Sequence, residues 1–195
     1  MKFVTLGPSG SNHEYVTRNY LAFHGIDRKA GVELAVDFEQ GARAVLTGEA
    51  DFLVQCAVHP ATMATVAKYL EGLYVVDTFI SPSQDLAIIR RKAAARSGTL
   101  AVMAPTLDYT DASRWDRIEY VATVAEVSSG LVEGKYDAGL GFVSVANAHA
   151  DQLVVEEFIG TVDDAWIVYG RTKISGGQLL AWPDSPAAAI FHEMA

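Results

Sequence analysis

Short apolar runs alternate along this chain with segments whose apolar residues recur at helical spacing. This alternation is typical of a largely parallel sheet covered by helices, because a helix must carry the chain back between parallel strands. It therefore predicts an α/β fold. The runs that read as strands are Phe3–Leu6, Asp51–Val54, Leu73–Phe79, Leu86–Arg90, Thr99–Met103, Ile118–Val121, Ala138–Phe142, Leu153–Phe158 and Ala165–Gly170.

The segments between these runs read as helices with recognisable ends. Ser11 is followed three residues later by Glu14, which predicts a capping box and a helix start, and Gly25 predicts the end of that helix. The residues expected on its inner face are Val16, Tyr20 and Phe23. Further helices are expected after Asp37 and over Ala61–Leu70, Thr110–Trp115, Ala125–Val132 and Ser144–Ala150.

The sequence contains one short internal repeat, which we call the internal echo. Residues 44–51 and 130–137 share a helix end, a glycine and an acidic turn, and each stretch runs into a buried strand. Two copies predict two lobes built alike, although any helix-to-strand connection in an α/β protein gives a similar pattern. The 195 residues are enough for two small lobes and too few for two large domains.

Charge and hydropathy exclude several classes of partner. The net charge of −9 argues against nucleic acid and against an anionic membrane. No apolar run approaches the roughly 20 residues that cross a bilayer, and a strand-like stretch starts at Lys2, which leaves no room for a signal peptide. With Cys56 as the one cysteine, no internal disulfide forms, and a cytoplasmic location is expected. The histidines lack metal-ligand spacing, so no metal is expected.

In open α/β sheets, ligands bind beyond the carboxyl ends of the strands. This rule selects four connections, which are Gly7–His13, Gln55–Thr62, Ser81–Asp85 and Ala104–Tyr109. The first follows Leu6 and reads Gly-Pro-Ser-Gly-Ser, a turn that directs backbone N–H groups and a positive helix end at the cleft. A small anion such as a carboxylate would bind there. A plain tight turn with a helix N-cap is the alternative.

Residues 4–14 read Val-Thr-Leu-Gly-Pro-Ser-Gly-Ser-Asn-His-Glu and resemble the start of prephenate dehydratases, Leu-Gly-Pro-Glu-Gly-Thr-Phe-Ser-Glu. The resemblance extends to about Arg171. It implies a two-lobed fold like that of type 2 periplasmic binding proteins, with the ligand cleft between lobe one (1–82 plus 167–195) and lobe two (83–166). The length is that of a dehydratase catalytic domain without the regulatory ACT domain.

The departures from the dehydratase pattern point to a branch of the family. The Thr-Arg-Phe signature is replaced by Asp164, Ala165 and Trp166, and a Glu-Asn-Ser stretch is replaced at residues 58–60 by Val-His-Pro. In both respects the chain resembles the non-aromatising prephenate decarboxylases of bacilysin-type antibiotic and other natural-product biosynthesis. The resemblance implies a carbon–carbon lyase that converts prephenate to dihydro-4-hydroxyphenylpyruvate without a cofactor. The alternatives are a dehydratase that forms phenylpyruvate and a non-catalytic small-anion-binding module.

Register with the family also suggests site residues. Gly10, Ser11 and Asn12 are expected to hold a substrate carboxylate. The expected catalytic residues are His13, which stands where dehydratases have serine, and Gln84, on the crossover between the lobes. Further residues expected to contact substrate are Gln55, Ser81, Ser83, Thr106 and Thr123. A homodimer is expected, with the apolar run Leu140–Val143 as either core or interface.

Overall fold

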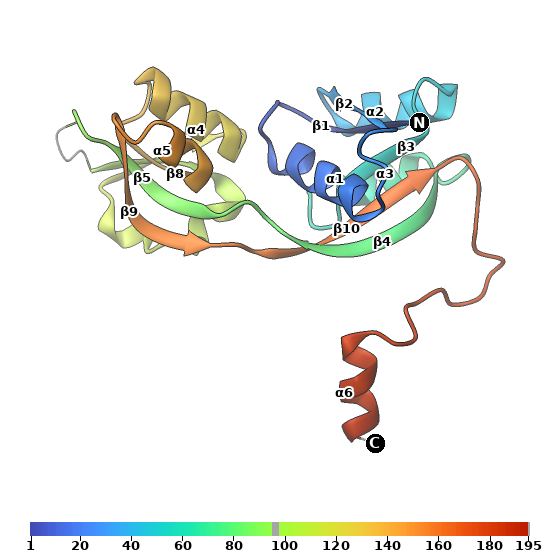
Figure 1. Ribbon diagram of the computed structural model, residues 1–195. Coiled ribbons are helices and arrows are strands. Elements are labelled where there is room, and N and C mark those ends of the chain that lie inside the picture. The colour runs from blue at the N-terminus through green and yellow to red at the C-terminus, as the bar shows by residue number, and fades with distance from the viewer. Residues whose placement is uncertain (95–97, 195) are drawn as a thin grey trace.

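The computed structural model describes residues 1–94 and 98–194, which form two lobes joined by two long connections (Figure 1). Each lobe is built on a five-stranded mixed sheet. The first sheet has the order β2 (Gly31–Ala35), β1 (Lys2–Leu6), β3 (Phe52–Cys56), β10 (Asp163–Gly170) and β4 (Tyr74–Pro82). The second has the order β7 (Arg117–Val121), β6 (Thr99–Met103), β8 (Ala138–Phe142), β5 (Leu86–Arg91) and β9 (Leu153–Gly160).

The helices are distributed between the two lobes and a C-terminal extension. Those of the first lobe are α1 (Asn12–Phe23), α2 (Phe38–Thr47) and α3 (Thr62–Lys68). Those of the second are α4 (Val124–Glu133), α5 (Val143–Ala148) and two 3₁₀ helices, η1 (Ala104–Tyr109) and η2 (Ala112–Arg114). The extension ends in α6 (Pro186–Met194). In the described part of the chain, no helix is long and apolar enough to cross a membrane.

The two sheets have the same topology. β1 pairs in parallel with β2 and β3, and β6 pairs in parallel with β7 and β8. In each sheet the two remaining strands are antiparallel additions, β10 and β4 in the first and β5 and β9 in the second. Both helices of the internal echo end at a glycine in the left-handed region, Gly48 with φ 85° and Gly134 with φ 80°. The prediction of two lobes built alike is confirmed.

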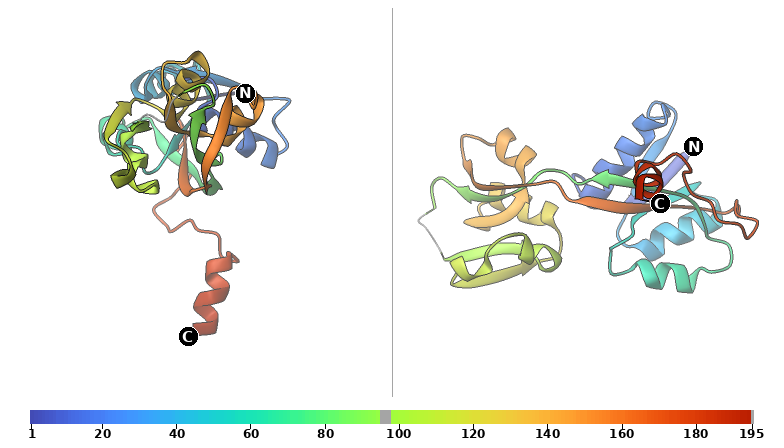
Figure 2. Two further views of the ribbon diagram at one scale, coloured as in Figure 1. Left: turned by 90° about the vertical axis from the view of Figure 1, so that its left-hand side faces the viewer. Right: turned by 90° about the horizontal axis from the view of Figure 1, so that it is seen from below.

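The chain crosses between the lobes twice, from β4 to β5 and from β9 to β10 (Figure 2). Asp163–Trp166, assigned to the second lobe from the sequence, pair with β4 and so extend the first sheet. Arg171 still binds the first lobe, because its guanidinium donates to Val45 O (2.6 Å) and Ala50 O (2.7 Å). The residues after Arg171, also assigned to the first lobe, instead lead away from the body (Figure 1). Their helix α6 has no buried residue and stands apart from both lobes (Figures 1 and 2).

Several local predictions need correction. Phe23 was expected on the inner face of the first helix, but it is 85% exposed. Its ring lies edge-on to the exposed ring of His24 at the end of α1. The helix expected over Thr110–Trp115 is reduced to the short η2. The edge strand β2 was not predicted, because its exposed position leaves it without a buried apolar run. For the run Leu140–Val143, left open as core or interface, the structure shows that Leu140–Phe142 is buried in the central strand β8 and is core.

Candidate functional site

A cleft of about 440 Å³ lies between the two lobes, within the usual size range of small-molecule sites. Each of the four connections selected from the sequence supplies part of its wall. Two further segments contribute to it, Val121–Ala125 around the start of α4 and the cleft end of β10, with Asp164 and Trp166. The strand-end rule therefore located the cleft but missed the wall that β10 supplies.

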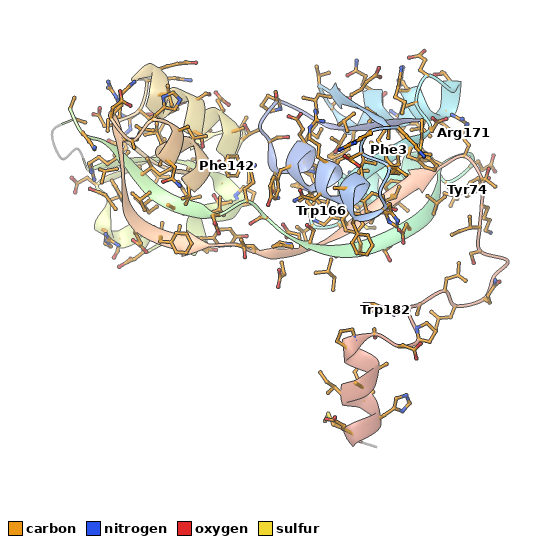
Figure 3. All side chains as sticks on the ribbon, viewed as in Figure 1. Phe3, Tyr74, Phe142, Trp166, Arg171 and Trp182 are labelled. Carbon is orange, nitrogen blue, oxygen red and sulfur yellow. The ribbon has the colours of Figure 1, made fainter. Side chains whose placement is uncertain are left out.

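Most of this wall is apolar. Its large side chains include Leu86, Met103 and Phe142 from the second lobe and Trp166 from the first. Figure 3 labels Trp166 in the first lobe and Phe142 at the side of the second lobe that faces it. Among the described residues that line the cleft, none is lysine or arginine, and Asp164 is the one acidic side chain. An anion in this cleft therefore has to be bound by dipoles.

The N-terminus of α1 supplies two such dipoles. Ser11 caps the helix, since its Oγ accepts a hydrogen bond from Glu14 N (3.2 Å) and donates one to Leu6 O (3.0 Å). The Gly10 N–H, which was expected to bind substrate, instead donates to the Glu14 carboxylate (2.8 Å). The first N–H groups of a helix have no partner within it, so those of Asn12 and His13 remain for a ligand.

The N-terminus of α4 provides the same arrangement in the other lobe. Thr123 caps it, accepting a hydrogen bond at Oγ1 from Glu126 N (3.0 Å). The N–H groups of Val124 and Ala125 are left free of helix partners, and all three residues line the cleft. Each lobe thus presents one positive helix end to the same cavity.

The remaining residues suggested from the sequence divide into two groups. Ser83 and Thr106 line the cleft. Their hydroxyl groups are engaged, because Ser83 Oγ accepts from Val162 N (2.9 Å) and donates to Gln84 O (3.0 Å), while Thr106 Oγ1 donates to Met103 O (2.9 Å). Ser83 thereby ties together the two connections between the lobes.

Gln84, Gln55 and Ser81 lie outside the cleft wall. Gln84 links the lobes, since its Nε2 donates to Gly10 O (3.1 Å) and its backbone N donates to Asn12 Oδ1 (3.0 Å). Gln55 is fully buried within the first lobe and donates to Thr65 Oγ1 (3.3 Å). Ser81 Oγ donates to Pro82 O (3.2 Å) on the crossover. Their side chains support the frame around the site and do not form its wall.

His13 lies among aromatic rings. Its ring is 5.0 Å from that of Trp166 and 5.7 Å from that of His59. Burial, with a smaller effect of His59, lowers the pKa of His13 to about 3. The imidazole is therefore neutral near pH 7, and its protonated form is not available as an acid. Its Nε2 is buried without a hydrogen-bond partner in the described structure.

Three ionisable groups meet at the β10 side of the cleft. Burial first, and then neighbouring Asp163, raise the pKa of Asp164. Burial first, and then the charge of Asp164, raise the pKa of Tyr109, although Tyr109 belongs to the second lobe. Burial raises the pKa of Cys56 to about 11, with Asp164 adding to the rise. All three side chains line the cleft.

A second hollow, of about 610 Å³, runs along β2 and α2. Three of the charged side chains that line it are paired, since Glu33 binds Lys2 (2.8 Å) and Glu39 binds both Arg43 and Lys68 (2.8 Å for the lysine). These salt bridges are exposed at the surface, and the hollow lies on the first lobe, outside the space between the lobes. The cleft between the lobes is the stronger candidate.

Replacing Ser11 with alanine should lower the free energy of unfolding by about 1 kcal/mol, because the substitution removes the N-cap of α1. Ser9→Ala is the matched control, since Ser9 is exposed and does not cap the helix. Its Oγ donates a hydrogen bond to the Glu14 carboxylate (Oε2, 3.0 Å). Urea unfolding followed by circular dichroism measures both variants. Equal stabilities for Ser11→Ala and Ser9→Ala would show that the cap contributes nothing.

No protein-family model and no curated protein sequence matches this sequence. Solved structures match its fold. Prephenate dehydratase from Arthrobacter aurescens, in complex with L-Phe, gives a TM-score of 0.68 at 16% identity, covering 97% of this chain and 70% of that one. Prephenate dehydratase from Staphylococcus aureus subsp. aureus Mu50 gives 0.63 at 11% identity, covering 98% and 78%.

A third structure, GqqA, described as a novel type of quorum quenching acylase, gives a TM-score of 0.55 at 13% identity, covering 97% of this chain and 74% of that one. At such identities the likeness is one of fold. The chain has the two-lobed α/β fold of these proteins, with a cleft between the lobes, and the predicted fold class is confirmed.

Proposed function

We propose that the cleft binds prephenate and releases carbon dioxide from it without forming an aromatic ring. The observation that carries this proposal is the pair of helix N-termini, α1 and α4, on opposite lobes of one apolar cleft. Each suits one carboxylate. Prephenate carries one carboxylate on its ring and a second at the end of its pyruvyl side chain, and it is the substrate that the sequence resemblance implies.

The environment of the cleft also suits decarboxylation. A carboxylate leaves as carbon dioxide more readily when its charge is removed from water, and the wall offers apolar side chains and no cation to hold the charge in place. The electron pair flows into the ring diene, so the substrate itself is the electron sink. No cofactor is required.

The fate of the ring hydroxyl decides between decarboxylation and the dehydratase alternative. If an acid protonates the hydroxyl as it leaves, the ring becomes aromatic and phenylpyruvate forms. If a ring carbon takes the proton, the hydroxyl stays and dihydro-4-hydroxyphenylpyruvate forms. The replacement of Thr-Arg-Phe by Asp164, Ala165 and Trp166 supports the second outcome, since the dehydratase threonine and arginine are both missing.

A non-catalytic binding module is the second candidate, because the same two helix ends would bind a dicarboxylate without reaction. Incubating purified protein with prephenate and identifying the products separates the three functions. Decarboxylation gives carbon dioxide and a hydroxylated, non-aromatic product. Phenylpyruvate would indicate a dehydratase, and binding without release of carbon dioxide would indicate a binding module.

A further inference from the structure

Asp164 lies near the start of β10, where this strand reaches the cleft. β10 runs antiparallel to β3 with Trp166 opposite Cys56, and Ala57 N donates to Ala165 O (2.8 Å) just beyond that pair. This pairing holds Asp164 at the cleft end of the strand. The Asp164 carboxyl is the one acidic side chain among the described residues of the wall.

We propose that Asp164 is the catalytic acid of the cleft and delivers the proton that a ring carbon takes up as carbon dioxide leaves. The assignment rests on the proposed function and adds the residue that performs its second half. Sequence comparison presents this position as the loss of a dehydratase threonine. In the structure this position carries a carboxyl group that lines the cleft.

The bond between the ring and its carboxylate breaks, and its electron pair becomes a new ring double bond. The π pair of the adjoining ring double bond then forms a C–H bond with the proton of the Asp164 carboxylic acid. Carbon dioxide and the hydroxylated diene are released, Asp164 is left as a carboxylate, and water reprotonates it before the next turnover.

The other ionisable groups of the wall are poorer donors. His13 has a pKa of about 3 and is neutral, and the pKa of His59 is also lowered by burial. Cys56, with a pKa of about 11, is a weak acid, and the pKa of Tyr109 is raised above its ordinary value. Asp164 differs because a raised pKa keeps a carboxyl group protonated closer to working pH.

Bound substrate strengthens this effect. Two nearby carboxylates disfavour a third negative charge, so prephenate itself raises the pKa of Asp164 further. The activity is expected to fall as the pH rises through that pKa, because the acid form is lost. The charged group next to Asp164 along β10 is Asp163, which is exposed and raises the pKa of Asp164. Tyr109 on η1 and Cys56 on β3 are the ionisable groups of the wall whose pKa values the charge of Asp164 raises.

The test compares Asp164→Asn with Asp163→Asn in the full chain. Asp164→Asn should lower carbon dioxide release by about 10²- to 10⁴-fold while prephenate affinity stays the same or improves, because a negative charge is removed. Asp164→Glu, which restores a carboxyl group, should retain more activity than Asp164→Asn. Asp163→Asn should keep the rate at low pH and move the loss of activity to lower pH.

Circular dichroism and thermal unfolding establish that each variant is folded, and calorimetry measures its prephenate affinity. Wild-type rates in folded Asp164→Asn, or an unchanged pH profile in Asp163→Asn, would overturn the assignment of Asp164 alone. Wild-type protein that releases no carbon dioxide would overturn the proposed function and this assignment with it.

Discussion

Replacing Asn12 with proline should weaken prephenate binding by about 10- to 100-fold. Asn12 is the first residue of α1, and its N–H is one of the two at this helix end that have no partner within the helix. Proline removes that N–H, and a hydrogen bond to a charged group contributes about 1.5–3 kcal/mol. Calorimetric titration of each folded variant with prephenate measures the loss.

The helix should tolerate this substitution. Proline is favoured at the first position of a helix, and the preceding Ser11 has ψ 159°, the extended conformation that a residue before proline adopts. Asn12→Ala is the matched control, because it keeps the N–H and removes only the side chain that accepts from Gln84 N (3.0 Å). If both variants bind prephenate equally, the N–H of Asn12 does not hold a carboxylate.

Replacing Trp166 with alanine should lower the free energy of unfolding by about 3–5 kcal/mol. The Trp166 side chain is 1% exposed, its ring stacks at 6.4 Å from Phe79, and it packs in the core between α1 and the first sheet. Deleting it opens a cavity that joins the floor of the cleft. Guanidinium unfolding of the two proteins measures the difference.

Trp166→Phe is the control for this substitution. Phenylalanine keeps a ring against Phe79 and His13 and leaves a much smaller cavity, so this variant should lose less than half as much stability as Trp166→Ala. A loss below about 1 kcal/mol in Trp166→Ala would mean that the site collapses around the missing ring.

Much of the fold could be predicted from local patterns. Nine of the strands that the structure describes were predicted from apolar runs in the sequence. The two helices that end at Gly48 and Gly134 predicted two similar lobes. The misses lie where burial does not shape the sequence. β2 is an exposed edge strand, and α6 packs against neither lobe, so neither carries a pattern imposed by a core.

The site was predictable as a region and much less so as a set of contacts. The strand-end rule found the loops, but nothing in the sequence shows that Glu14 takes the N–H of Gly10 or that Gln84 binds the Gly10 carbonyl. Tyr109 and Asp164 come from different lobes, and only the folded chain brings them to one cleft. Asp164 was visible in the sequence solely as a replaced motif.

The position of hydrogen uptake distinguishes decarboxylation without aromatisation from the other two functions. Purified protein is incubated with prephenate in deuterated water, and the product is analysed by NMR and mass spectrometry, with carbon dioxide measured in parallel. We expect carbon dioxide equal to the prephenate consumed, and a product that keeps its hydroxyl group and carries one deuterium at a single ring carbon, in one configuration. Phenylpyruvate as the product, or prephenate recovered unchanged, would contradict it.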